Sequence, residues 1–140
     1  MKINTIYSEE IEIDDENIIN FEDGIPGFDQ MKKFAILNIE QSPFKWLQSI
    51  EDKDVALPII NPFDIKEDYE FDIDSITEGK LQIKNVQDIV VYSVVVIPGD
   101  DLSKMSANLK APIIVNAANN KAKQMIMENL YYQIFHVVIL

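Results

Sequence analysis

The chain has 140 residues, 47% of them hydrophobic and 26% charged, with a formal net charge of −12; this composition predicts one soluble globular domain spanning residues 1–140. The absence of cysteine excludes a disulfide framework, thiolate metal sites and a cysteine nucleophile. Every cation is a lysine, and an acidic chain without arginine lacks the side chains that dominate phosphate and base recognition. We therefore expect no direct nucleic-acid binding.

We expect no targeting signal at the start of the chain, because acids at Glu9, Glu10 and Glu12 stand where a signal peptide has a basic and then an apolar region. The longest charge-free runs, 89–99 and 129–140, have 11 and 12 residues. A helix needs about 20 apolar residues to cross a bilayer. We expect a cytoplasmic protein with no membrane span.

Short apolar runs rich in isoleucine, valine and aromatic residues predict β-strands along most of the chain. The predicted strands are residues 3–7, 11–13, 18–21, 34–39, 44–49, 55–60, 69–73, 89–97, 111–116 and 123–127. Helix is scarce: residues 74–78 could open one turn, which Gly79 weakens, and residues 128–135 are ambiguous. The fold class is therefore all-β, a small antiparallel, partly open β-barrel-like single domain with little helix.

Several positions refine this prediction. Residues 25–28 place Pro26 second and Gly27 third, which predicts a type II turn. Pro58 inside an apolar run indicates an edge strand or a bulge. The run 89–97 is almost entirely apolar, so we expect a central strand that is covered on both faces.

Residues that carry catalysis are few. His136 is the sole histidine, and no nucleophile-elbow motif accompanies it. The acidic clusters lack the spacing of a calcium loop, and the four glycines form no phosphate-binding loop. We expect no catalytic residues, no metal and no cofactor.

Acidic residues beside aromatic ones are the remaining functional signal. Phe44 and Trp46 precede an acidic turn, and Tyr69 lies between Asp68 and Glu70. Aromatic rings with a carboxylate rim can select a cationic partner, although alternate core positions are the better explanation for most of these rings. If Tyr69 faces the core, Glu70 faces solvent.

The charge is unevenly distributed along the chain. Residues 1–78 hold 20 acidic residues and 6 lysines, a net charge of −14, whereas residues 79–140 hold 4 acidic residues and 6 lysines, a net charge of +2. An acidic first half indicates either a basic partner or a surface whose charge serves solubility.

Ordered motifs over most of the chain resemble the flagellar assembly factor family FliW. They are residues 21–28 (FEDGIPGF), 42–49 (SPFKWLQS), 61–63 (NPF), 68–70 (DYE) and 108–116 (NLKAPIIVN). The resemblance implies a non-enzymatic cytoplasmic protein that binds newly made flagellin. When flagellin is secreted, such a protein binds CsrA, an RNA-binding translational repressor, and relieves repression of flagellin synthesis.

The resemblance and the residue patterns together suggest which side chains bind these partners. Asp68, Tyr69 and Glu70 are expected to face CsrA, whose basic RNA-binding surface suits an acidic domain. Phe44 and Trp46 are candidates for an apolar groove that takes the amphipathic helices of flagellin. Two alternatives remain open, a small carboxylate-based hydrolase and an oligonucleotide-binding β-barrel.

Overall fold

The computed structural model describes residues 1–7, 9–127 and 134–136. The strands are β1 (Lys2–Asn4), β2 (Glu10–Glu12), β3 (Ile18–Phe21), β4 (Lys33–Asn38), β5 (Phe44–Ser49), β6 (Ala56–Ile60), β7 (Ile89–Val96), β8 (Ser106–Asn108), β9 (Ile113–Asn116), β10 (Lys121–Gln124) and β11 (Ile134–His136). The helix is α1 (Ser75–Leu81), and single 3-10 turns are η1 (Asp15–Asn17), η2 (Pro62–Asp64), η3 (Val86–Asp88), η4 (Pro98–Asp100) and η5 (Leu102–Lys104).

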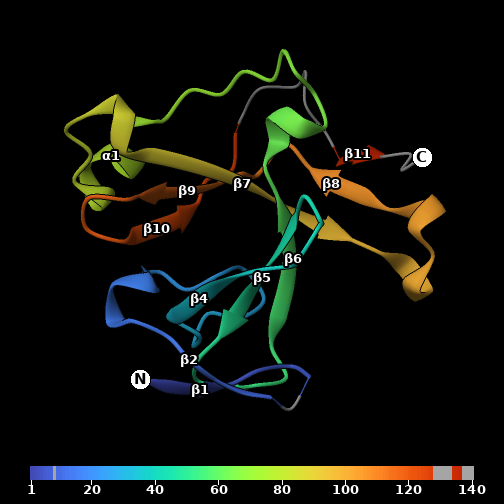
Figure 1. The fold of residues 1–140 in the computed structure, drawn as a ribbon. Helices are drawn as coiled ribbons and strands as arrows, with labels where there is room; N and C mark the ends of the chain where they lie inside the picture. The colour runs from blue at the N-terminus through green and yellow to red at the C-terminus, as the bar shows by residue number, and fades with distance from the viewer. Residues whose placement is uncertain (8, 128–133, 137–140) are drawn as a thin grey trace.

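Seven of the described strands form a closed barrel. Their order is β7-β6-β5-β4-β3-β10-β9, and β9 pairs back with β7 (Figure 1). All neighbours in this ring are antiparallel except β3 and β10, which are parallel. The predicted all-β barrel is confirmed; the ring is closed rather than partly open, and it is mixed rather than purely antiparallel.

The barrel interior is filled by the side chains that alternate inward along its strands. Buried members of this core include Phe21, Phe34, Leu47, Ile59 and Ile113. The rings of Phe21 and Phe34 meet edge-on with centroids 5.3 Å apart, a favourable arrangement for aromatic pairs. Period-two alternation therefore accounts for the core.

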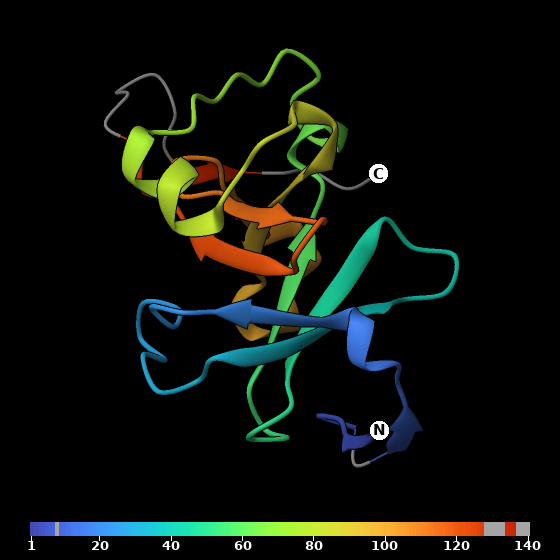
Figure 2. The ribbon, with the colours of Figure 1, turned by 90° about the vertical axis from the view of Figure 1, so that its left-hand side faces the viewer.

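Apolar side chains on the outside of the barrel are covered by three separate segments. The hairpin β1–β2 packs Ile3 and Ile13 near Ala35 of β4. A second cluster joins Val95 of β7 to Met105, which precedes β8, and to Ala107 of β8. A third is covered by the connector of residues 61–74 and by α1, and it contains Tyr69, Leu81, Val91, Leu109, Ile114, Met125 and Met127. Figure 2 shows the hairpin at one end of the molecule and this connector at the other.

Several predictions about individual elements can be compared with the structure. The type II turn is confirmed, because Phe28 N donates to Ile25 O at 2.7 Å and Gly27 has φ +89°. The middle of β7 is covered on both faces, as predicted for the run 89–97, whereas Val90 and Val96 near the ends of the strand are 36% and 56% exposed. Pro58 pairs with Trp46 of β5 but lies outside the β6–β7 register, as its missing N–H requires.

The predictions for residues 69–73 and for the helix differ from the structure. The strand predicted at residues 69–73 is wrong, because this segment forms no strand in the described part of the chain. Its alternation arises from packing one side against the barrel, and a strand also needs a backbone partner. The helix is longer than the predicted single turn, since α1 runs through Gly79 to Leu81. Of the ambiguous residues 128–135, residues 134 and 135 belong to β11 and residues 128–133 lie outside the described residues.

Candidate functional site

A large surface groove lies between the 61–74 connector, α1 and the residues that follow β10. Its volume is about 780 Å³. The apolar lining consists of Phe63, Tyr69, Phe71, Ile76, Met125, Ile126 and Met127. Three exposed acids, Glu70, Asp72 and Asp74, also line it. We call this the acidic-aromatic groove.

The aromatic lining is built by one short stretch of chain. Asn61 opens η2 by accepting a hydrogen bond from Phe63 N at 2.9 Å. The rings of Tyr69 and Phe71 stack with centroids 5.8 Å apart, and Phe63 meets Tyr69 edge-on at 5.8 Å. These contacts hold three rings together at the groove.

Tyr69 anchors the connector to the barrel. Its side chain is 3% exposed, and its hydroxyl donates a 2.6 Å hydrogen bond to Leu109 O. The neighbouring Asp68 and Glu70 are exposed, as the alternation argument predicted for Glu70. Of the predicted triplet, the two acids therefore face solvent, while most of the tyrosine is inside the protein.

Lysines and backbone amides hold several carboxylates of this region in their charged form. Lys66 lies 3.0 Å from Asp68 and lowers the pKa of that carboxyl. The N–H of Thr77 donates to Asp74 at 2.7 Å and lowers the Asp74 pKa. A hydrolase acid needs a raised pKa, so these shifts give the hydrolase alternative no support.

An ion-pair cluster fixes α1 to the barrel beside the groove. Asp23, in the turn after β3, lies 2.8 Å from Lys80 of α1 and 3.4 Å from Lys123 of β10. Lys80 is the main cause of the lowered Asp23 pKa, and Asp23 in turn raises the pKa of Lys80. The cluster connects three segments distant in sequence.

Trp46 and Phe44 lie away from this groove. Trp46 lines a second groove of about 480 Å³ beneath the β1–β2 hairpin, which we call the hairpin groove. There its ring meets Tyr7 edge-on with centroids 5.9 Å apart. Phe44 is half-buried against the cluster that contains Ile60 and Val95. The five predicted binding residues are therefore distributed over three places.

Sequence reasoning missed important parts of the acidic-aromatic groove. Asp72 and Asp74 continue the same alternation as Glu70, and that signal could have extended the site. Met125 and Met127 follow β10 and reach the groove only because β10 pairs with β9. No local sequence signal reports such a pairing.

Two further observations concern the described residues only. They contain no group of three or more histidine, cysteine, aspartate or glutamate side chains placed to hold a metal ion. No helix among them is long and apolar enough to span a membrane.

Comparison with known proteins agrees with this fold. The family model described as FliW protein matches residues 2–138. The flagellar assembly factor FliW of Caldicellulosiruptor bescii is 51% identical over 123 residues, covering 88% of this chain and 80% of that protein. The one from Thermoanaerobacter pseudethanolicus is 46% identical over 141 residues, covering 99% and 93%.

A solved structure gives the same result in three dimensions. The crystal structure of a flagellar assembly factor FliW superposes with a TM-score of 0.90 at 36% identity, covering 100% of this chain and 98% of the solved one. Both the sequence and the barrel are therefore shared over almost their whole length, and the chain belongs to the FliW family.

Proposed function

We propose that this protein is a non-enzymatic, cytoplasmic flagellar assembly factor that binds flagellin and CsrA in alternation. When flagellin is secreted, the protein binds CsrA and relieves repression of flagellin translation. The proposal draws on the name carried by its relatives, flagellar assembly factor FliW, and on the acidic surface described above.

The acidic-aromatic groove is the observation that carries the proposal. Its exposed carboxylates, Glu70, Asp72 and Asp74, border an apolar lining that includes Phe63 and Phe71. A repressor that binds RNA must present a basic surface, which such carboxylates attract and orient. The rings supply the apolar contact area on which affinity depends. We assign CsrA to this groove.

Flagellin is assigned to the hairpin groove. Its lining is rich in apolar side chains, among them Ile11, Ile36 and Trp46. The ends of flagellin are amphipathic helices, and such helices place one apolar face in a groove of this kind. Phe44 does not line this groove and packs against the cluster of Ile60 and Val95, so its proposed flagellin contact lies outside the groove.

Glu70→Lys tests the CsrA assignment. Removing a negative charge and adding a positive one at the rim should weaken CsrA binding by about tenfold at low salt, and less at high salt, because ions screen exposed charges. The measurement is isothermal titration with CsrA from the same organism at two salt concentrations.

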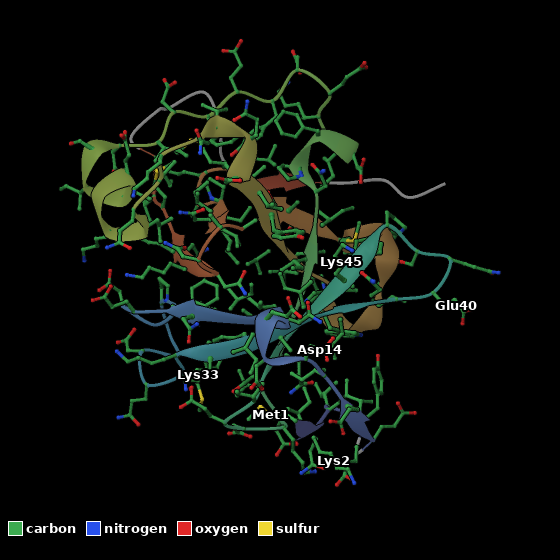
Figure 3. All side chains as sticks on the ribbon, turned by 60° about the vertical axis from the view of Figure 1, so that its left-hand side comes forward. Met1, Lys2, Asp14, Lys33, Glu40 and Lys45 are labelled. Atoms are coloured by element: carbon green, nitrogen blue, oxygen red, sulfur yellow. The ribbon has the colours of Figure 1, made fainter. Side chains whose placement is uncertain are left out.

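Glu40→Lys is the matched control, because it makes the same change of charge elsewhere. Figure 3 labels Glu40 at the tip of the turn between β4 and β5, remote from α1. Equal binding by wild type and Glu70→Lys would contradict the assignment. An equal loss in both variants would mean that only the net charge matters.

Alternation between the partners needs a separate experiment. Because the two partners are assigned to separate grooves, alternation requires that binding at one groove weakens binding at the other, so titrating flagellin into a preformed complex should release CsrA. Release can be followed by size-exclusion chromatography. A stable ternary complex would contradict alternation and leave both single assignments standing.

A further inference from the structure

Residues 71–73 of the connector that lines the acidic-aromatic groove carry backbone groups that have no partner among the described residues. Among the described residues, nothing forms a hydrogen bond with the backbone N–H or C=O of Phe71, Asp72 or Ile73. The side chains of this segment alternate between half-buried and exposed, as in a strand. Figures 1 and 2 both show the connector running in an extended path across the end of the molecule, before α1.

The connector borders two cavities. Phe71 and Asp72 line the acidic-aromatic groove and also a neighbouring cavity of about 490 Å³, which Val86 lines as well. An extended backbone that is unpaired and accessible is a template for strand addition, in which main-chain hydrogen bonds supply affinity and side chains supply specificity.

The chemistry of the groove defines what such an added strand must carry. Asp72 is exposed between Glu70 and Asp74, so three carboxylates line one side of the segment. Phe63 and Met125 offer an apolar surface beside them, and methionine adapts to side chains of different shape. The neighbouring cavity selects a basic segment less strongly, because its lining contains a positive charge, Lys84, as well as the negative charges of Asp72 and Glu78.

We propose that the backbone of residues 71–73 pairs with an extended segment of a partner protein in which basic and apolar residues alternate. The basic side chains lie against Glu70, Asp72 and Asp74, and the apolar ones enter the acidic-aromatic groove. This inference deepens the proposed partner-binding role and rests on it, because it specifies the conformation in which a basic partner is held.

A peptide whose backbone is modified tests the pairing without changing the protein. The probe is a short fluorescent peptide that alternates lysine and valine, measured by anisotropy with the full chain. Two derivatives of this peptide carry backbone N-methyl groups, one on the odd-numbered residues and the other on the even-numbered residues. Each derivative therefore blocks the N–H groups along one edge of the peptide strand. Because successive residues of a strand present their N–H groups to opposite edges, one derivative should bind about tenfold more weakly and the other as the parent does.

The peptide series includes a control for conformation. An isomer with the same composition, arranged with valines at helical spacing, should bind more weakly than the alternating peptide. Equal binding by the parent and both methylated forms would overturn backbone pairing, and so would tighter binding of the helical isomer.

Proline substitutions test the same contact from the protein side. Asp72→Pro and Ile73→Pro each remove one N–H that is unpaired in the described structure, and proline also favours an extended residue before it. Compared with Asp72→Ala and Ile73→Ala, one proline variant should lose a further tenfold in peptide binding, with unfolding temperature as the folding control. If neither proline variant binds more weakly than its alanine counterpart, the inference is overturned.

The proposed function and this inference can fail separately. CsrA binding that depends on Glu70, together with peptide binding that ignores N-methylation, would leave the function standing and overturn the strand addition. Methylation-sensitive peptide binding without CsrA binding would overturn the assigned partner and support the strand-addition surface.

Discussion

The turn after β3 depends on one residue, Gly24, whose backbone conformation other residues resist. Its φ is +70°, and its N–H donates to Phe21 O at 2.9 Å. A Cβ atom at this position would lie 2.4 Å from Asp29 O, a backbone atom that cannot move aside alone. The same turn holds Asp23, which pairs with Lys80 of α1. One glycine thus supports the ion-pair cluster beside the groove.

Gly24→Ala should therefore destabilise the protein by about 2 kcal/mol or more, from the left-handed backbone and the clash together. Gly79→Ala is the matched control, because a Cβ there meets no atom within 4 Å and the residue lies inside α1. That control should stabilise the protein by about 0.5–1 kcal/mol. Urea unfolding measures both; the same sign for the two variants would contradict the argument.

Tyr69 offers a test that separates anchoring from partner contact. Tyr69→Phe keeps the buried ring but removes the hydroxyl that donates to Leu109 O. Losing this buried hydrogen bond should cost about 1–2 kcal/mol of stability. Because Tyr69 is almost fully buried, CsrA affinity should change less than in Glu70→Lys. Urea unfolding measures the stability of Tyr69→Phe, and titration of the same sample with CsrA measures its affinity. Unchanged stability together with lost CsrA binding would show that Tyr69 contacts the partner directly.

At the scale of elements, α1 is short and depends on its first turn. Asp74 precedes the helix with φ −68° and ψ 160° and accepts the hydrogen bond from Thr77 N. An N-terminal cap of this kind is worth about 1 kcal/mol, a large share for two helical turns. Because α1 contributes Ser75 and Ile76 to the acidic-aromatic groove, the cap also stabilises one of its walls.

Asp74→Ala should lower stability by about 1 kcal/mol at neutral pH, and the difference from wild type should shrink in acid. Folding lowers the Asp74 pKa below its ordinary value of 3.8. The carboxylate therefore contributes fully above its unfolded pKa and loses its contribution as pH falls through the folded pKa. Thermal unfolding between pH 7 and pH 3 measures this.

Asp72→Ala is the control for the cap, because no hydrogen bond or ion pair in the described residues involves the Asp72 side chain. Its stability should stay within about 0.5 kcal/mol of wild type at every pH. A constant difference between Asp74→Ala and wild type down to pH 3 would contradict a role for the charged cap.

The elements also show how far sequence reasoning reaches. Strands β3 and β5 have the predicted bounds of 18–21 and 44–49, because turn residues flank a clear apolar pattern. β8 was missed because three small or polar residues, Ser106–Asn108, carry no such pattern. The segment 69–73 alternates as predicted without forming a strand, since alternation reports burial and not pairing.

At the scale of the whole molecule, the closure of the barrel depends on pairing between strands that are distant in sequence, which local patterns do not report. The barrel closes where β10 pairs in parallel with β3, about a hundred residues earlier, and where β9 returns to β7. No periodicity names a strand's partner, so an all-β barrel was predictable from the sequence and its closure was not. The acidic side chains of the acidic-aromatic groove were likewise predictable from the alternation around Glu70, but the position of Met125 and Met127 in the groove was not.

The two proposed binding surfaces lie at different ends of the molecule. A fluorescent residue at one end can therefore distinguish a partner that binds there from a partner that binds at the other end. The hairpin that covers the hairpin groove and the connector that lines the acidic-aromatic groove lie at opposite ends in Figures 1 and 2. Trp46, the sole tryptophan of the sequence, lines the hairpin groove and contacts Tyr7 there.

Tryptophan emission should therefore distinguish the partners. Flagellin, which we assign to the hairpin groove, should shift or quench the emission of Trp46 because it removes the half-buried indole from water. CsrA should leave that emission unchanged, since its assigned surface is at the other end. Titrations of Trp46→Phe supply the partner's own signal for subtraction. If CsrA shifts the emission as flagellin does, the two partners share a surface, and alternation follows from direct overlap rather than from two separate sites.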